Sequence, residues 1–400
     1  MSFQQGLSGL DAAAKNLDVI GNNVANANTV GFKESGVNFG DVYAASLAGA
    51  GANAVGIGTQ VMDVAQEFSQ GNITTTSNPL DVAINGKGFF RMDDNGAISY
   101  SRNGQFQLDK NGCIINSDGI KLTGFQALNG TLVPGSLVDL AVPTTDIAPT
   151  ATTKATVGVN LSSSDAVLPL TGFVATDPTT YDRSTGMTVY DSLGQQHAMT
   201  LYFNKTATNS WAVNVYIDGN AATGSPSTLA FNPDGSLASA TNLAMSVNVT
   251  SGAAPLAINM DYGAVTQYGS AFGVNSLSQD GYGAGQLSGF DIGSDGTLTG
   301  TYTNGQTQTL GQVALADFTN PQGLRPLGQN LWAETSDSGQ PLVGAPGTAS
   351  LGSLQSAAVE DSNVDLTKEL VNMITAQRTY QANAQTIKTQ DTVMQTLVSL

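Results

Sequence analysis

The chain has 400 residues, 31 acidic and 14 basic, so its formal net charge is −17, although charged residues make up only 11% of it. This length is enough for two or three domains with hydrophobic cores of their own. Phosphate binding needs clustered Lys and Arg, but neither residue occurs from Thr206 through Leu324. The composition therefore argues against nucleic-acid binding and against a polybasic membrane patch.

Cysteine and histidine occur once each, as Cys113 and His197. A single cysteine cannot form an internal disulfide. One Cys and one His supply too few ligands for a zinc site made of these residue types, so we expect no cofactor and no metal. Metal binding through carboxylates alone stays open. His197 stands near the start of an alternating strand, where an ordinary sheet residue is the first expectation. Phosphate-loop, nucleophile-elbow and metalloprotease motifs do not occur, which makes an enzyme the weaker hypothesis.

The amino end does not have the pattern of a cleavable signal peptide. Its first residues, MSFQQGLSGLDAAAKNLDVI, contain no basic stretch followed by a continuous apolar one. We also find no run that approaches the roughly 18 apolar residues of a membrane span. Ordinary rules then predict a cytoplasmic protein without membrane insertion.

The first segment has the spacing of a helix. Apolar or small residues alternate every four and three positions, which is a heptad seam on a helix of about 25 residues. The turn-rich run 26–31 is its expected end. The residues of this seam are Phe3, Leu7, Leu10, Ala14, Leu17, Gly21 and Val24.

The last segment repeats this spacing over a longer range. Asp365 is the expected N-cap, and the helix would be about 50 Å long at 1.5 Å per residue. The segment is rich in Gln and Thr rather than in charge, unlike a solvated stalk held by ion pairs. Its seam consists of Leu366, Leu370, Met373, Gln377, Tyr380, Ala384, Ile387, Asp391 and Met394, with Leu397 and Leu400 beyond.

Between the helices, pairs of Asn or Asp with Gly indicate tight β-hairpins, because both central residues of a type I′ turn need positive φ. These pairs are Asn95-Gly96, Asn103-Gly104, Asn111-Gly112, Asp118-Gly119, Asn129-Gly130, Asp280-Gly281, Asp295-Gly296 and Asn304-Gly305. They favour two β-rich blocks, at 71–145 and 276–362, that form one middle domain.

A different β pattern fills the stretch between these blocks. Apolar residues alternate at 199–203 and at 211–217, which is typical of a half-buried antiparallel sheet. We therefore predict that 146–275 is an outer β domain inserted into the middle one. Residues 31–70, rich in Gly and Ala, are the expected connector. The predicted fold class is α+β, mainly β, with terminal helices at 1–30 and 363–400 paired as a coiled coil.

The terminal helices need partners, because each has an apolar seam that a single helix leaves in water. In one interpretation they pack onto the β body as an ordinary α+β domain. In the second, more specific interpretation, helices of neighbouring subunits pack against the seams and form a helix bundle, so the seams are an assembly interface. The residues predicted for that interface are Phe3, Leu7, Leu10, Leu17, Val24, Leu366, Leu370, Met373, Tyr380, Ile387, Met394 and Leu397.

Two long motifs now point to a family. Asn16–Lys33, NLDVIGNNVANANTVGFK, resembles the amino-terminal signature of bacterial flagellar rod and hook proteins. Ser362–Ile374, SNVDLTKELVNMI, and Gln377–Asn383, QRTYQAN, closely resemble their carboxyl-terminal signature. The segments LDVAINGKGFF at 80–90 and YSRNGQF at 100–106 are similar to the shared β domain. The signature residues carried over are Asn22, Asn23, Asn26, Gly31, Phe32, Gln377, Arg378, Tyr380 and Asn383.

Within that family, the chain's length and its insertion favour a hook subunit over a distal rod protein or a junction protein. The resemblance implies a homopolymer in which paired helices line an export channel and the tube transmits torque as a universal joint in motility. It also implies partners among rod and hook–filament junction proteins, a hook cap and the type III export gate. Export without a cleaved signal would replace the cytoplasmic expectation.

A short aromatic motif, Phe39 to Tyr43, resembles the segment with which early export substrates are thought to engage the export gate. An aromatic pair tucked onto the body is an equally good interpretation. For the asparagines at 22, 23 and 26, contacts between helices and ordinary fraying at a helix end both remain open.

Overall fold

The computed structural model describes residues 2–42, 56–168, 172–239, 241–249 and 251–398. The chain divides into two compact units. The first unit consists of Met1–Thr144, Gly289–Gly300 and Thr307–Leu400, and the second consists of Thr145–Ser288 and Thr301–Gln306. The second unit therefore extends beyond residue 275, where the sequence placed its end, because β20 (Gly273–Gln279) pairs with β11 (Lys154–Ser162) of the same unit.

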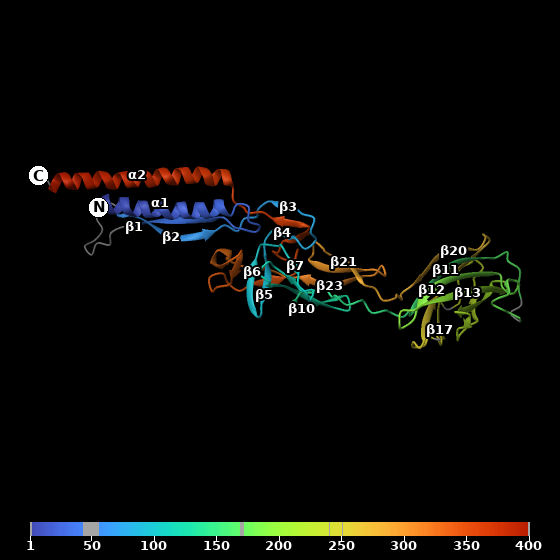
Figure 1. The fold of residues 1–400 in the computed structure, drawn as a ribbon. Coiled ribbons are helices and arrows are strands. Elements are labelled where there is room, and N and C mark those ends of the chain that lie inside the picture. The colour runs from blue at the N-terminus through green and yellow to red at the C-terminus, as the bar shows by residue number, and fades with distance from the viewer. Residues whose placement is uncertain (1, 43–55, 169–171, 240, 250, 399–400) are drawn as a thin grey trace. The chain divides into compact units, whose positions relative to one another are not determined.

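The terminal segments form two helices, α1 (Ser2–Ala25) and α2 (Leu366–Val398). They lie side by side and antiparallel (Figure 1), since Gly6 lies against Ile387 at one end and Asn23 contacts Glu369 at the other. The predicted pairing of the helices is confirmed. Asp365 caps α2, because its Oδ1 accepts hydrogen bonds from the backbone N–H groups of Thr367 and Lys368.

The face along which the helices meet coincides with the predicted heptad seam only in part, because Ile387 of the seam lies against Gly6 but other seam residues are exposed. On α1 the buried side chains are Ala12, Ala13, Val19, Ile20 and Asn23, whereas Phe3 and Leu7 of the seam are 51% and 46% exposed. On α2 the buried residues are Glu369 and Ala376. Glycine and alanine positions contribute to this buried face, and a pattern based on large apolar residues does not detect them.

Two glycines of α1 explain the close approach of the helices. A Cβ on Gly9 would lie 2.8 Å from Asn383 Nδ2, and one on Gly6 would lie 3.1 Å from Ile387 Cγ1. Glycine is unfavourable inside a helix, so these positions weaken α1 in isolation. In the pair they allow the two backbones to come together, as small residues do in tightly packed helix contacts.

Residues 31–70 are not the plain connector that the sequence predicts. They contain β1 (Ser35–Val42) and β2 (Gly58–Gln66), which form an antiparallel hairpin beside α1 (Figure 1). Gln5 Nε2 donates to the Gly56 carbonyl at 2.6 Å, and Ser8 Oγ accepts from the Thr59 N–H at 3.3 Å. The hairpin was missed although its strands contain Val37, Phe39 and Val64, because the Gly and Ala content of 31–70 suggested a connector.

The first unit is built around a thirteen-stranded sheet of the described residues. Its main path runs β21 (Leu287–Ile292), β22 (Thr297–Tyr302), β23 (Thr307–Val313), β9 (Lys121–Leu128), β5 (Phe89–Asp94), β6 (Ala97–Ser101), β26 (Leu331–Ala333) and β25 (Arg325–Gly328). Off this path lie β7 (Gln107–Leu108), β8 (Ile114–Ile115), β10 (Thr131–Asp139), β24 (Leu315–Asp317) and β27 (Leu342–Gly344).

Two small strand pairs complete this unit and join distant parts of the chain. They are β4 (Val82–Asn85) with β28 (Ser353–Ser356), and β3 (Ile73–Thr75) with β29 (Ala358–Glu360). A core of aromatic rings lies beside them: Phe89, Tyr100, Phe318 and Trp332 are buried and meet edge to face. The segments before α2 and after β2 are thereby tied into one body.

The second unit holds two five-stranded sheets of the described residues around one hydrophobic core. In the first sheet are β17 (Asn242–Val247), β18 (Leu256–Asp261), β11, β19 (Thr266–Tyr268) and β20. In the second are β12 (Arg183–Tyr190), β13 (Gln196–Ala207), β14 (Ser210–Ile217), β15 (Asn220–Ala221) and β16 (Ser227–Ala230). Single 3-10 turns occur at Pro178–Thr180 and Pro321–Gly323.

The alternation predicted for this unit is confirmed. Leu201 faces Val215 and Phe203 faces Val213 across β13 and β14, and these four side chains are at most 1% exposed.

The prediction of type I′ turns at pairs of Asn or Asp with Gly is only partly right. Both residues have positive φ at Asn95-Gly96 and Asn129-Gly130, as a type I′ turn requires, whereas in the other six predicted pairs at most the glycine does.

The glycines of α1 give a test of the helix pair. A Cβ on Gly21 would meet no described atom within 4 Å, whereas one on Gly9 would lie against Asn383. We expect Gly21→Ala to raise the free energy of unfolding by about 0.5–1 kcal/mol through helix propensity alone. Gly9→Ala should give no gain, or a net loss, because Asn383 has to move. Chemical denaturation of the two variants compares them, and equal gains would contradict the close contact.

Candidate assembly interface

Asn23 joins α1 to both of its neighbours. Its Nδ2 donates to the Ser35 carbonyl at 2.8 Å, and its Oδ1 accepts from the Ser35 N–H at 3.0 Å, so its amide pairs with the backbone of β1. The same Nδ2 lies 3.1 Å from Glu369 Oε2 on α2. Asn23 is 1% exposed. One asparagine thus fixes α1, β1 and α2 relative to one another.

Glu369 is the partner of this amide on α2. Its side chain is buried, and its second oxygen accepts from Asn372 Nδ2 at 2.9 Å. A buried polar group costs free energy unless it is hydrogen-bonded, so this carboxylate favours the one helix register that brings Asn23 to it. A groove of about 660 Å³ lies beside this contact, bordered by α1, β1 and α2.

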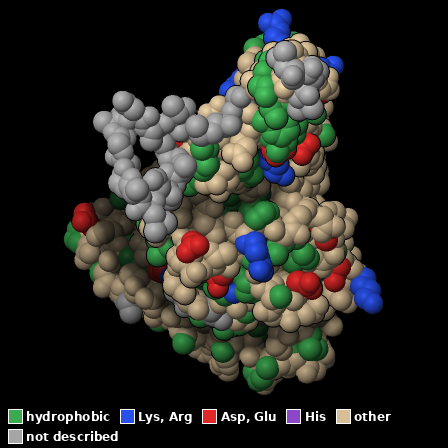
Figure 2. Space-filling model, turned by 90° about the vertical axis from the view of Figure 1, so that its left-hand side faces the viewer, with side chains coloured by type: hydrophobic (Ala, Val, Ile, Leu, Met, Phe, Trp, Pro, Cys, Tyr) green, Lys and Arg blue, Asp and Glu red, His purple; other side chains and the backbone are tan. Residues whose placement is uncertain are grey.

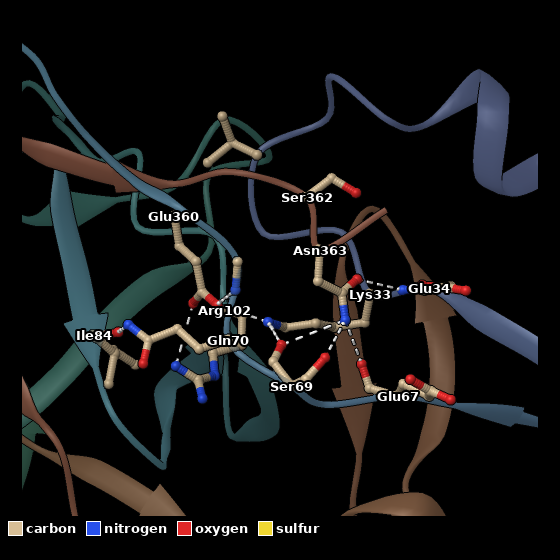
Figure 3. Close-up of polar contacts among 12 residues, drawn as sticks. Lys33, Glu34, Glu67, Ser69, Gln70, Ile84, Arg102, Glu360, Ser362 and Asn363 are labelled. Carbon is tan, nitrogen blue, oxygen red and sulfur yellow. Dashed lines mark hydrogen bonds and ion pairs between the residues drawn. The ribbon is translucent and has the colours of Figure 1, made fainter. Parts of the chain in front are cut away.

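A second buried polar cluster ties three distant segments together (Figure 3). Glu360 Oε1 accepts from Lys33 Nζ at 2.7 Å and from the Gly71 N–H at 2.9 Å. Its Oε2 lies 3.2 Å from Arg102 Nη1. The Lys33 and Glu360 side chains are fully buried, and that of Arg102 is 4% exposed. The cluster joins the segment after α1, the β-sheet and the segment before α2.

Two cations share this one carboxylate, so backbone carbonyls supply the remaining acceptors. Lys33 Nζ donates to the Ser69 carbonyl at 2.7 Å, and Arg102 Nη2 donates to the Gly86 carbonyl at 2.8 Å. Burial lowers the pKa of Lys33 below its ordinary value, although Glu360 offsets part of this effect. Burial likewise lowers the pKa of Arg102. Charges held in this way tolerate the loss of a partner poorly.

The outer side of the helix pair carries unpartnered apolar side chains. Leu366, Leu370 and Ile374 follow one another at helical spacing on α2 and are 41%, 49% and 51% exposed. Figure 2, which views the end where both termini lie, shows hydrophobic side chains gathered on the helical part of the molecule. Farther along α2, Met394 and Leu397 are 60% and 68% exposed. Large exposed apolar patches are typical of surfaces that bind another molecule.

The residues predicted for the interface divide between exposed and half-buried positions. Phe3, Leu7, Leu366, Leu370, Tyr380, Met394 and Leu397 are exposed, whereas Leu10, Leu17, Val24, Met373 and Ile387 are half-buried. The exposed members are free to contact a second chain. For the half-buried members, the contacts within the unit already use part of the surface, and their role in assembly stays a prediction.

The family-signature residues have distinct surroundings. Gly31 is buried at φ +72, and a Cβ there would lie 2.7 Å from the Asn103 backbone nitrogen, so only glycine fits. Asn383 packs against Gly9, and Phe32 is half-buried. Asn26 bonds to Asn22 in the last turn of α1, with Nδ2–Oδ1 at 2.7 Å. Gln377, Arg378 and Tyr380 are exposed on α2.

The short aromatic motif is described only in part. Phe39 lies on β1 and is 44% exposed, which does not support its being tucked onto the body. Tyr43 lies outside the described residues. The buried charges Lys33, Arg102, Glu360 and Glu369 were not predicted from the sequence. Their signal was weak but present, because in a chain with 11% charged residues Glu360 follows the apolar run Ala358-Val359.

The charge cluster predicts a large effect of one isosteric change. Glu360→Gln leaves two buried cations without their carboxylate, and we expect a loss of about 3–5 kcal/mol in the free energy of unfolding. The matched control is Asp139→Asn, which breaks the exposed pair Lys121–Asp139. That change should lower stability far less. Urea denaturation measures both, and similar losses would contradict the importance of the cluster.

Neighbouring asparagines provide a second comparison. Asn23→Ala leaves Glu369 and the Ser35 backbone without their partner, so we expect a loss of about 1–3 kcal/mol. Asn22 is exposed and has the same chemistry, so Asn22→Ala serves as the control with a smaller loss. Thermal unfolding followed by circular dichroism at 222 nm separates the two variants. If both lost the same stability, the link through Asn23 would be unimportant.

Four family models match successive parts of the chain. They are "Flagella basal body rod protein" at residues 3–33, "Flagellar hook protein FlgE/F/G D1 domain" at 83–160, "Flagellar basal body protein FlaE D2 domain" at 160–282 and "Flagellar basal body rod FlgEFG protein C-terminal" at 355–400. The first and last of these matches contain most of α1 and all of α2. The other two cover much of the β-rich part between them.

Relatives match over the whole chain. The flagellar hook protein FlgE of Escherichia coli K12 is 44% identical, and both chains are covered completely. The flagellar hook protein FlgE of Borreliella burgdorferi is 34% identical over the whole of this chain and 99% of its own. The crystal structure of Helicobacter pylori flagellar hook protein FlgE2 is similar in fold, with a TM-score of 0.54 and 15% identity over 72% of this chain and all of that one. The chain therefore belongs to the flagellar hook protein FlgE family.

Proposed function

We propose that this chain is the structural subunit of a flagellar hook, which assembles with copies of itself into a curved tube and transmits torque as a universal joint. The observation that carries the proposal is the apolar stripe of α2, where Leu366, Leu370 and Ile374 are about half exposed although the helix is already paired. A second copy would cover it. The match to hook proteins over the full chain supports the same role.

The chemistry of the chain suits a tube that bends as it rotates. Such a tube needs neighbouring subunits to slide past one another, and fixed ion pairs would resist sliding. Charged residues make up only 11% of the chain, so contacts between copies would be many, weak and mostly uncharged. In this proposal the terminal helices drive assembly, whereas the second unit and the segment 31–70 set the flexibility. The role is mechanical rather than enzymatic.

The remaining partners follow from the family resemblance. Rod and hook–filament junction proteins would meet the two ends of the tube, and a hook cap and the flagellar type III export gate would act during assembly. The exposed Phe39 on β1 is available for contact with such a gate. The proposed location is the extracellular hook attached to the basal body, reached without a cleaved signal peptide. No helix in the described part of the chain is both long and apolar enough to cross a membrane.

A charge placed in the apolar stripe tests the assembly role. Leu370→Asp puts a carboxylate where a neighbouring copy would exclude water, so we expect polymerisation to fail or to need a much higher protein concentration. The monomer should keep its fold, because Leu370 is exposed in the single chain. Light scattering and negative-stain electron microscopy follow the tubes, while circular dichroism follows the fold.

Thr386→Asp is the matched control for this experiment. Thr386 is exposed and lies roughly on the opposite side of α2, at 100° per residue, and it receives the same charge. We expect this variant to polymerise like the unchanged protein. Tubes formed equally well by Leu370→Asp would contradict the assembly role of the stripe.

A further inference from the structure

The single histidine of the chain is buried between two carboxylates of the second unit. His197, near the start of β13, is 6% exposed. Its Nδ1 lies 2.5 Å from Asp218 Oδ2, and its Nε2 lies 3.1 Å from Asp191 Oδ2. Ionised carboxylates only accept hydrogen bonds, so both contacts are satisfied only when both ring nitrogens carry a proton. The geometry therefore corresponds to a charged imidazolium.

The two carboxylates also organise the loops around the ring. Asp191 Oδ1 accepts from the N–H groups of Leu193 and Gln195, both at 2.9 Å, and so closes the turn between β12 and β13. Its Oδ2 accepts from Ser251 Oγ at 2.6 Å. Asp218 follows β14, and its Oδ1 accepts from the Ala198 N–H at 2.9 Å. Three loops at one end of the second unit thus meet at the histidine.

The turn after β12 supports the two segments through which the chain enters and leaves this unit. These segments, 147–150 and 282–285, pair through antiparallel bridges at Ile147–Gly285 and Thr150–Tyr282. Gly194 of the turn approaches them so closely that a Cβ on it would lie 2.7 Å from Pro149 Cβ and 3.3 Å from the Ala284 nitrogen. A change at the turn would reach the paired segments directly.

We propose that His197 is a proton-controlled clamp, which in its charged form holds the turn 191–194 against the paired segments 147–150 and 282–285. Loss of the ring proton at alkaline pH removes one of its two carboxylate contacts and loosens this end of the unit. The clamp itself is independent of the proposed hook function. Its consequence for a tube, a stiffness that depends on pH, rests on that function.

The direction of the pH effect follows from the charges that face the ring, which are Asp191 from the end of β12 and Asp218 from the end of β14. Burial opposes the charge on His197, but hydrogen bonds to Asp218 and Asp191 outweigh it and raise the pKa of His197 above its ordinary value of 6.5. The stabilisation is therefore complete below pH 6.5 and is lost as pH rises through the raised pKa. Although burial opposes it, hydrogen bonding leaves the pKa values of Asp191 and Asp218 below their ordinary value.

Nuclear magnetic resonance of the full chain, labelled with ¹⁵N-histidine, tests the charge state directly. One histidine gives one set of ring signals without further assignment. We expect both ring nitrogens to be protonated at pH 6.5 and to titrate at a higher pH. Asp218→Asn keeps the turn, since Asn tolerates the φ of +49 found there, and should lower the midpoint. A ring that titrates at or below 6.5 would overturn the proposal.

Amide hydrogen exchange tests the mechanical link. As the pH rises and His197 loses its proton, the protection factors in 147–150 and 282–285 should fall in a single step. The fall should be roughly tenfold for each pH unit by which the midpoint of the His197 titration exceeds 6.5. His197→Gln should remove the step, and α2 should show none in either protein. If His197→Gln does not fold, Asp218→Asn should shift the step to lower pH. A step unchanged by these substitutions, or its absence in the unchanged protein, would refute the clamp.

Discussion

The buried contact among Lys33, Glu360 and Arg102 is the constraint on which the first unit depends. The three residues are far apart in the sequence, yet each lies where a different part of the chain must meet the others. Lys33 follows the loop after α1, Arg102 follows β6, and Glu360 ends β29 shortly before α2. Separating these segments would leave buried charges without partners, so the cluster favours the arrangement in which the three segments meet.

The contact between the two helices combines two glycines with the buried pair Asn23–Glu369. Gly6 and Gly9 let α1 approach α2, and Asn23 selects the register by pairing with Ser35 and Glu369. Several large apolar residues, among them Leu366, Leu370 and Ile374, then remain exposed on α2. If the leucines of α1 and α2 lay in the contact between the two helices, the isolated subunit would be more stable. Fewer apolar side chains would then remain exposed to bind a neighbouring copy. The structure thus separates the contact that holds one subunit together from the surface proposed to join subunits.

The sequence predicts both helices well, because heptad spacing and the Asp365 cap are local signals. It predicts the paired faces poorly, since the contact depends on glycines and on Asn23, which an apolar pattern ignores. The hairpin β1–β2 escaped detection because the Gly and Ala content of 31–70 suggested a connector, and its polar contacts to α1 join residues 51 positions apart.

Long-range contacts are harder still to predict. Nothing near Glu360 in the sequence points to Lys33 or Arg102, and nothing near His197 shows that Asp218 will meet its ring. His197 lies on a strand, as expected from the sequence, but its contacts with the carboxylates of Asp191 and Asp218 were not predicted. Such contacts form only when loops from separate strands come together, so a single sequence carries no local trace of them.

The most direct test of the account is an electron cryomicroscopy map of the assembled tube at side-chain resolution. The account predicts that Leu366, Leu370 and Ile374 are buried against a neighbouring copy, while Gly9 and Asn383 remain in contact within each subunit. A tube in which this stripe faces solvent, or in which α1 and α2 of one chain have separated, would contradict it.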